Sequence, residues 1–583
     1  AKYKKENQEL LSYLLYESID EANYIEQVQA EIDEMFDLLI DNGSYKYMKQ
    51  IRKISARFII VVSLVSAVTS CKKVVDVDPI SNEAVKNYYK NYKEVSVALA
   101  GCYNGMQEPL INEWQFTELR SDNARQRSVN STTNVNMELN VLNLYTAGPS
   151  HQQIYNYWLA VYKNIRNVNY VLRSLGVTYQ GGQLVFGTPT ATVTDAQRDE
   201  LVGQALFIRA YHYFNLVRLY GGVFIVTEPL EAAQARKVNR SSVNDCYNLI
   251  VKDLEAAVAK ASAKPFGQIT STDLGRANAW SAKALLAKVY LTLPTPRAAD
   301  ALTLLNDVIA NSGYGLENSF ARVFAINNEM NKEILFAVRY KAGLVGLGNP
   351  MANMFAPASS GDAIINGDGG GFNYPTTSIN TAFTTSATSF SDARKDVTIA
   401  AYSNSTTPLY VNKFFSKVVV ANDAENDFTV LRFSDVLLLK AEAQGYDGAA
   451  GSSVGLINQV RERAGAGNYT TGNFTSAFYK YPASGTGSIA SAADFQTAVL
   501  KERRLEFAFE NQRLFDLMRF GQAVTNMQNH YATEYSAYYS RFNPTIPLAT
   551  LQANINNDKL LLPIPQREID TNTDIKIPQN PGY

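Results

Sequence analysis

The chain contains 583 residues, 46% of them apolar and 11% aromatic, which is enough to build a large buried core. A formal net charge of -1 gives no basis for the phosphate neutralisation on which nucleic-acid binding depends, so we expect no nucleic-acid partner. The three cysteines and three histidines are scattered, which argues against a disulfide framework, a metal centre or a histidine-based catalytic triad. We therefore expect a globular protein without a metal or other cofactor.

Residues 1–47 form an acidic segment with apolar side chains at helical spacing. Leu11 and Leu15 lie one helical turn apart, as do Ile32 and Phe36, and acidic residues occupy the opposite face. This pattern predicts one or two amphipathic helices. Because an export signal follows at Met48, and such a signal must lie near the start of the translated chain, we interpret residues 1–47 as an extension outside the native mature protein.

Residues 48–70 have the order of a secretory signal peptide. A basic stretch from Met48 leads into the apolar run "FIIVVSLV", which is too short to span a bilayer core of ~30 Å, and small residues follow. The ending "VTSC" resembles the lipobox of bacterial lipoproteins, so Cys71 is the predicted lipidation site, and its acyl chains would anchor the protein in a membrane. The alternative is a short buried strand or helix that ends at a core cysteine.

The rest of the chain, residues 71–583, is predicted to be mainly α-helical. Apolar and aromatic residues recur every three or four positions in successive segments, and no alternation of strands with helices appears. Residues from about 155 to 315 include two Ala-rich segments, 275–293 and 299–316, that are typical of tetratricopeptide-like hairpins, although an ordinary antiparallel pair fits them too. Residues 343–391 are rich in Gly, Asn, Ser and Pro, and predict a long irregular region of functional importance before helices return in 392–583.

Several of these segments together resemble the RagB/SusD family of nutrient-uptake outer-membrane lipoproteins. They are "ALFIRAYHYFNLVRLYGGVFIVTEPL", "RFSDVLLLKAEA", "VRERAG", "LKERRLEFAFENQRLFDLMRFG" and the closing "LLLPIPQREIDTNTDIKIPQNPGY". The resemblance runs in order from Cys71 to Tyr583. It implies a tetratricopeptide-containing scaffold with a shallow face that binds oligosaccharide or polysaccharide. It also implies a SusC-like TonB-dependent transporter as partner, and a lipid anchor in the outer membrane with the protein facing outward.

The segment "ERRLEFAFENQRLFDLMRFG" offers several acids that a glycoside hydrolase could use. Glu502, Glu506 and Glu510 recur one helical turn apart, but arginines are interleaved with them and would hold their pKa values low. A general acid needs a raised pKa, so we interpret these acids as structural ion-pair partners and expect no catalytic residues. We interpret Arg209 as a structural ion-pair residue too.

Two regions combine aromatic rings with polar groups, as a glycan site requires. In "NEWQFTELRSDNARQR", Trp114 precedes the polar residues Asp122, Asn123 and Arg125, which the family resemblance places near the ligand face. Trp114 is equally consistent with a core position, because tryptophan buries a large area. The second region is the Gly-rich loop; its predicted ligand-binding residues are Phe355, Phe372, Asn373 and Tyr374. A plain surface loop is the alternative there.

Function therefore has one leading hypothesis and three alternatives. The leading one is non-catalytic capture of a glycan for import; the others are a peptide or glycopeptide receptor of the same uptake type, a surface glycoside hydrolase, and a bare scaffold for protein partners. Whether Cys102 and Cys246 pair or remain buried free thiols stays open from the residues alone.

Overall fold

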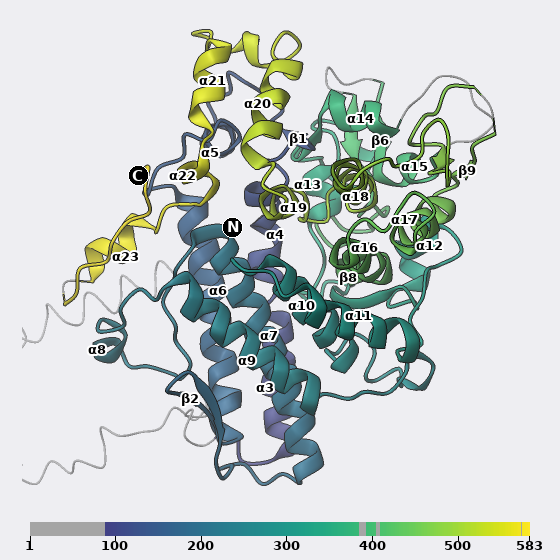
Figure 1. Ribbon diagram of the computed structural model, residues 1–583. Helices are drawn as coiled ribbons and strands as arrows, with labels where there is room; N and C mark the ends of the chain where they lie inside the picture. The colour runs from purple at the N-terminus through teal and green to yellow at the C-terminus, as the bar shows by residue number, and fades with distance from the viewer. Residues whose placement is uncertain (1–87, 384–391, 404–407, 471, 573) are drawn as a thin grey trace, which may run out of the picture. The chain divides into compact units, whose positions relative to one another are not determined.

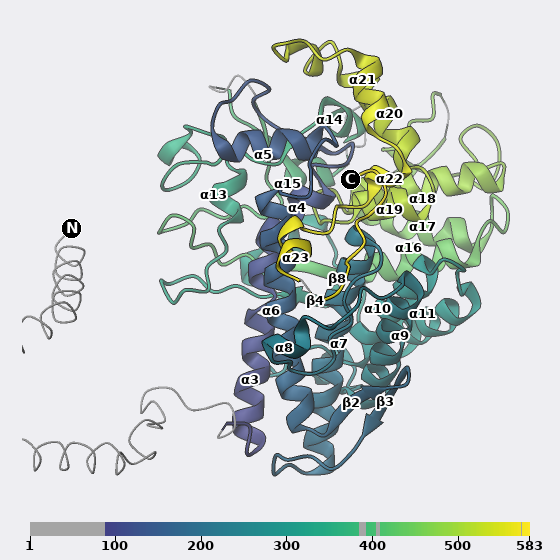
Figure 2. The same cartoon turned by 90° about the vertical axis from the view of Figure 1, so that its left-hand side faces the viewer.

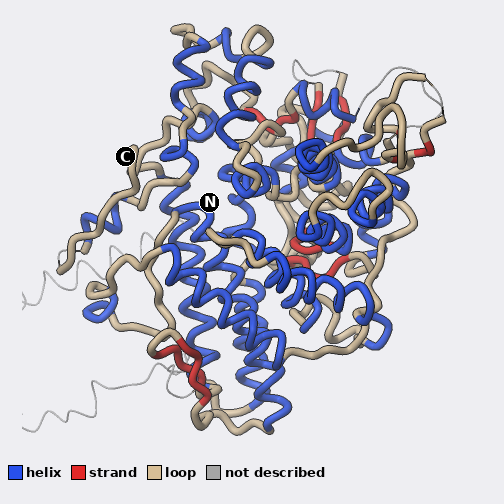
Figure 3. Tube along the Cα trace, viewed as in Figure 1, coloured by secondary structure: helices blue, strands red, loops and turns tan. Residues whose placement is uncertain are grey.

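The computed structural model describes residues 88–383, 392–403, 408–470, 472–572 and 574–583, all of which belong to one compact unit, Lys86–Tyr583. Three predictions fall outside these residues: the acidic extension 1–47, the signal peptide 48–70 and the lipidation site Cys71. The prediction of a mainly α-helical protein is confirmed, since helices account for 50% of the structure and strands, which are short, for 9% (Figure 3).

The first part of the unit is an array of long helices. Each of its consecutive members packs against the next: α6 (Gln152–Ser174), α7 (Asp195–Tyr220), α9 (Val243–Lys260), α10 (Ala279–Thr292) and α11 (Ala298–Asn311) (Figure 1). Such nearest-neighbour stacking of helices is consistent with the predicted tetratricopeptide-like scaffold.

Helix α7 is the centre of this array. Its side chains from Leu201 to Val217 are all buried, so the helix is surrounded by packing partners rather than amphipathic. A capping box of Thr194 and Gln197 begins it, and Gly221, whose φ of 73° is in the left-handed region, ends it. Helix α3 (Tyr92–Asn104) lies against α6 and α7 and buries Val95 and Leu99, which lie one helical turn apart.

A second group of helices completes the unit. α11 packs on α16 (Phe433–Gln444), and α16 in turn contacts α17 (Ser452–Arg463) and α18 (Ala492–Glu506). α19 (Arg513–Arg519) and α20 (Ala523–Glu534) follow along the chain, and α19 packs against both α18 and α20 (Figure 2).

Short two-stranded sheets connect distant parts of the chain. The longest such pair is antiparallel, between β4 (Ile334–Val338) and β8 (Phe428–Arg432), and all ten of its residues are buried. β1 (Ala124–Arg125) pairs antiparallel with β5 (Tyr374–Pro375), which lies within the Gly-rich segment. That segment also contains the short helices α13 (Met351–Phe355) and α14 (Thr377–Phe383).

The remaining elements are short or peripheral. They are α4 (Gln107–Thr117), α5 (Asn134–Asn143), β2 (Val177–Gln180), β3 (Gln183–Phe186), α8 (Ala232–Ala235), α12 (Phe320–Val323), α15 (Arg394–Thr398), β6 (Ile399–Ala401), β7 (Leu409–Val411), β9 (Gly467–Asn468), β10 (Tyr479–Lys480), α21 (Leu548–Asn554), α22 (Asn557–Leu560) and α23 (Gln566–Thr571).

The C-terminal segment folds back over the end of α7. Leu562 N donates to Leu219 O at 2.7 Å, and the buried Asn580 donates through Nδ2 to Tyr220 O at 2.9 Å and to Leu562 O at 2.7 Å. Arg240 completes the contact by donating to Asn580 Oδ1. The Pro-rich end is therefore an integral part of the fold. In the part of the chain that the structure describes, no helix has the length and apolarity needed to cross a bilayer.

Candidate functional site

The pairing of β1 with β5 brings the two predicted ligand regions together. Arg125 lies opposite Tyr374 in the register, and Thr376 N donates to Asn123 O at 2.9 Å. Thr376 Oγ1 also donates to Asp122 O at 2.8 Å across a separation of 254 residues. The loop before β1 and the part of the Gly-rich segment that precedes β5 thus form one continuous region of the molecule.

Three aromatic rings pack at this junction. Trp114, whose position the sequence leaves open, lies in the core with 2% of its surface exposed. Phe355 meets it edge to face at 5.7 Å between ring centroids, and Phe372 stacks on it at 6.0 Å. Phe372 is only partly buried, so it is the ring of this trio that reaches solvent. The rings of Trp114 and Phe355 lie behind it in the core.

Asn373 and Tyr374 are buried beside these rings with unsatisfied polar groups. The two polar atoms of the Asn373 side chain, Tyr374 Oη and Trp114 Nε1 have no hydrogen-bond partner among the described residues. Asn373 has a φ of 55°, in the left-handed region. Buried polar atoms normally have hydrogen-bond partners, and each one without a partner lowers the stability of the fold by about 1–3 kcal/mol. A polar group that reached these atoms and bonded to them would therefore stabilise the protein.

The side chain of Asn123, one of the predicted ligand residues, is completely buried. Its Oδ1 accepts from Arg504 Nε at 2.9 Å, and its Nδ2 donates to Glu118 Oε2 at 3.1 Å. Both ends of the amide are therefore committed to protein partners. Asn123 positions Arg504 and the start of β1 rather than facing solvent.

Arg125 is the second predicted residue that remains partly exposed. Its guanidinium carbon lies 4.4 Å from the centroid of the Tyr538 ring, a cation–π contact that fixes the side chain on the surface of the junction. The other six predicted ligand residues are buried in the free protein: Trp114, Asp122, Asn123, Phe355, Asn373 and Tyr374.

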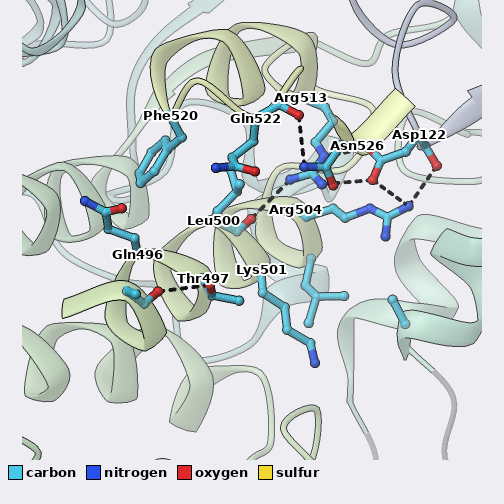
Figure 4. Close-up of a pocket in the computed structure, with 13 residues that line it drawn as sticks. Asp122, Gln496, Thr497, Leu500, Lys501, Arg504, Arg513, Phe520, Gln522 and Asn526 are labelled. Carbon is cyan, nitrogen blue, oxygen red and sulfur yellow. Dashed lines mark hydrogen bonds and ion pairs between the residues drawn. The ribbon is translucent and has the colours of Figure 1, made fainter. Parts of the chain in front are cut away.

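Asp122 lies on the wall of a pocket of about 410 Å³ between α18, α19 and α20 (Figure 4). Exposed polar side chains form its rim and arginines its inner wall. Its lining residues are Asp122, Ala382, Ala493, Gln496, Thr497, Leu500, Lys501, Arg504, Leu505, Arg513, Phe520, Gln522 and Asn526. Of these, sequence reasoning singled out only Asp122 for ligand binding. The spacing of Lys501 and Arg504, three residues apart on one helix, is the signal that could have indicated a basic face.

Two arginines hold the Asp122 carboxylate in its ionised form. Arg513 donates from Nε to Oδ1 at 2.7 Å and from Nη2 to Oδ2 at 2.9 Å, and Arg504 Nη2 lies 3.3 Å from Oδ2. Burial alone would raise the pKa of Asp122, but the charges of Arg504 and Arg513 and the hydrogen bonds from Arg513 outweigh it and lower the pKa well below its usual range. This carboxylate is therefore not a proton donor near neutral pH.

The acids of the C-terminal helical segment are structural ion-pair partners, as predicted. Glu502 accepts from Arg461 at 2.9 Å, and Glu510 accepts from Lys413 at 2.9 Å. Burial raises the pKa of Glu506, but several arginines around it lower the pKa far more. The full set of side chains in this network is Glu333, Asp392, Arg394, Lys413, Arg432, Arg461, Arg463, Glu502, Glu506 and Glu510. Arg209 is likewise paired with Asp253 at 2.7 Å, with both side chains buried.

Cys102 and Cys246 are separate, buried free thiols, which resolves the question that the sequence leaves open. Burial raises the pKa of Cys102 to about 12 and that of Cys246 to about 11, so both stay protonated at neutral pH. Across the described ranges, no group of three or more His, Cys, Asp or Glu side chains is placed to hold a metal ion.

Comparison with known families gives two matches. The model described as "SusD family" matches residues 396–583, and the model described as "Starch-binding associating with outer membrane" matches residues 84–291. Among individual proteins, SusD-like protein P25 of Formosa agariphila is 25% identical over 88% of this chain and 96% of its own length. SusD-like protein P38 of the same organism is 24% identical over 82% of this chain and 94% of its own length.

Solved structures show the same fold. A protein described as a laminarin binding SusD-like protein superposes with a TM-score of 0.66 at 23% identity and covers 85% of this chain and 100% of its own. Surface glycan-binding protein A from Bacteroides thetaiotaomicron, solved in complex with laminarihexaose, gives a TM-score of 0.64 at 18% identity, and 84% of this chain and 99% of that one are covered.

Proposed function

Because the chain belongs to the SusD-like family, we propose that it is a non-catalytic receptor that binds oligosaccharide or polysaccharide outside the cell for import. The observation that carries this proposal is the correspondence over nearly the whole length of the described unit with solved proteins described as binding laminarin and laminarihexaose. Both family matches and the full-length relatives support the same assignment.

We place the ligand face at the β1–β5 junction. Phe372 offers a partly exposed ring that can stack on a sugar, and Arg125 offers a guanidinium for hydroxyl groups. The buried residues Trp114, Asn373 and Tyr374 lie behind this face, and their unsatisfied polar atoms favour a ligand that brings hydroxyl groups.

Delivery to a SusC-like TonB-dependent transporter is the second part of the proposal. The protein would be anchored in the outer membrane through a lipid on Cys71, face outward, and pass its ligand to the transporter. The support is the family match described as starch-binding and associating with the outer membrane, together with the signal-like sequence before Cys71. Co-purification of the tagged protein with a barrel transporter from outer membranes tests this part, and labelling of Cys71 by a palmitate analogue tests the anchor.

Glycan binding is tested by isothermal calorimetry of residues 72–583 against a panel of neutral and acidic oligosaccharides. We expect at least one glycan to bind, without release of reducing ends on prolonged incubation. Binding of peptides with no glycan bound would instead establish the alternative of a peptide receptor. Release of new reducing ends by the pure protein would show it to be a glycoside hydrolase and overturn the proposal.

A further inference from the structure

The pocket between α18, α19 and α20 carries more positive than negative charge. Arg504, Arg513 and Lys501 line it, and Asp122 is its only acidic lining residue. Figure 4 shows Asp122, Arg504 and Arg513 joined on one side of the pocket, while Lys501 extends from α18 on its own. A cluster of this kind leaves net positive charge facing the pocket.

Two other buried clusters in the described chain contain equal numbers of positive and negative side chains. The first contains five cations, Arg394, Lys413, Arg432, Arg461 and Arg463, and five acids, Glu333, Asp392, Glu502, Glu506 and Glu510. The second contains Lys288, Arg503 and Arg519 with Glu442, Asp435 and Asp516. Because an unpaired buried charge is costly, the excess of positive charge at the pocket contrasts with the balance in these two clusters.

The donors in the pocket are only partly used. Arg513 is fully committed, with Nε and Nη2 bonded to Asp122 and Nη1 donating to Leu500 O at 3.2 Å. Arg504 uses Nε and Nη2, but its Nη1 has no hydrogen-bond partner among the described residues. Lys501, which is exposed at the pocket, forms neither an ion pair nor a hydrogen bond with any described side chain or carbonyl.

Two more acids, Glu118 and Glu534, lie near this cluster and offset part of the charge of Arg504. Neither Glu118 nor Glu534 forms an ion pair with Arg504 or Arg513 within the described chain. Glu118 is bonded to Asn123, and burial raises its pKa to about 7, which weakens its charge near neutral pH. Glu534 accepts a hydrogen bond from Ser378 N at 3.1 Å.

The rest of the lining suits a sugar ring that bears the anion. The side-chain amides of Gln496, Gln522 and Asn526 stand around the pocket with the partly exposed ring of Phe520, a combination that can bind hydroxyl groups and one face of a pyranose. The volume of about 410 Å³ lies within the range of small-molecule sites and exceeds what a bare anion needs.

We propose that this pocket binds the anionic group, a carboxylate or a sulfate ester, of an acidic saccharide, with Arg504 and Lys501 as its cationic contacts. This inference rests on the proposed glycan-binding function and narrows its ligand class. The neutral part of the same chain would extend from the pocket toward the β1–β5 junction, which Asp122 and Asn123 connect to it.

Calorimetry with three matched probes tests the assignment: a neutral hexasaccharide, an oligogalacturonate of the same length and a sulfated oligosaccharide. A charge-assisted contact predicts roughly tenfold tighter binding of at least one acidic probe than of the neutral one. Which acidic probe binds distinguishes a carboxylate from a sulfate ester. Inorganic sulfate at constant ionic strength should compete with it, because both need the same cations.

Two exposed substitutions keep the test independent of folding. Lys501→Gln removes a contact, and Gln522→Glu places a negative charge on the rim; each should weaken binding of the acidic probe several-fold, and by a larger factor than it weakens binding of the neutral probe. Lys237→Gln, which removes an exposed lysine elsewhere, is the control with the same net charge as Lys501→Gln. Two outcomes would overturn this inference and leave the proposed glycan binding intact. They are equal affinities for the neutral and acidic probes, and an affinity for the acidic probe that neither pocket variant changes. Failure of every glycan to bind would reject the proposed function as well.

Discussion

Arg513 binds Asp122 through two parallel hydrogen bonds of 2.7 and 2.9 Å, although the two residues are 391 positions apart in the chain. The pair joins α19 to the loop that leads into β1, and Arg504 on α18 reaches the same carboxylate. The orientation of the candidate ligand face therefore depends on α18 and α19, two helices near the C-terminal end of the chain.

Substitution of Asp122 by asparagine should destabilise the protein strongly. It removes the negative charge from two buried guanidinium groups, and loss of one partner from a buried pair costs about 3–5 kcal/mol. The free energy of unfolding from denaturant titration measures the effect. Glu108→Gln is the control, because its pair with Lys163 has side chains 58% and 55% exposed and should contribute less than about 1 kcal/mol. Similar losses for both variants would contradict a structural role for the Asp122–Arg513 pair.

Glu118 should make the protein less stable as the pH rises from 5 to 8. Burial raises its pKa from 4.5 to about 7, so its favourable contribution is complete below pH 4.5 and is lost as the pH rises through 7. The Glu118→Gln variant keeps a hydrogen-bond acceptor for Asn123, but its side chain cannot ionise. It should therefore lose less stability than the wild type between pH 5 and 8. Glu462→Gln, on a side chain that is 64% exposed, should leave the pH profile as it is. An unchanged slope in the Glu118 variant would show that this carboxyl titrates normally.

Phe372→Ala should weaken glycan binding without unfolding the protein. Loss of one stacking ring corresponds to about 0.5–1.5 kcal/mol, or a two- to tenfold higher Kd. Calorimetry with the best ligand of the panel measures the change. Phe186→Ala removes a ring that is 41% exposed on β3, outside the junction, and serves as the matched control. Equal affinities of the Phe372 variant and the wild type would move the ligand face away from the β1–β5 junction.

Asn580→Ala should loosen the C-terminal segment. The side chain donates to Tyr220 O and Leu562 O, and buried carbonyls that lose their donor cost about 1–3 kcal/mol. We expect a lower unfolding midpoint and faster proteolytic cleavage after residue 560. Asn529→Ala, an exposed position within α20, should be neutral or slightly stabilising, because alanine favours helix. Resistance of the Asn580 variant to protease would indicate that other contacts hold this segment.

Cys102 and Cys246 should not react with thiol reagents in the folded protein. Both are buried with raised pKa values, so neither accessibility nor thiolate character favours reaction. In a variant with Cys71 replaced by serine, we expect no labelling in native buffer and two labelled thiols in denaturant. Rapid native labelling of one site would reveal local opening around α3 or α9.

The sequence predicts the ion pairing of Glu506 because that prediction needs only local order. Arginines at helical spacing neutralise nearby acids wherever the helix lies in the fold. It leaves Trp114 undecided between core and ligand face, because a large aromatic ring is compatible with both. The family resemblance suggests a ligand-face position for Asn123, and only its contacts with Arg504 and Glu118 reveal a buried, satisfied amide.

From the sequence alone, the helical scaffold, the long irregular segment and the family resemblance were predictable, since periodicity, composition and motif order are local properties of the chain. The register that sets Arg125 opposite Tyr374, the pairing of Asp122 with Arg513, and the pocket in which Lys501, Arg504 and Arg513 outnumber the single acid Asp122 appear only in the tertiary structure. These features depend on contacts between residues hundreds of positions apart, and burial and charge balance arise from that packing rather than from local pattern.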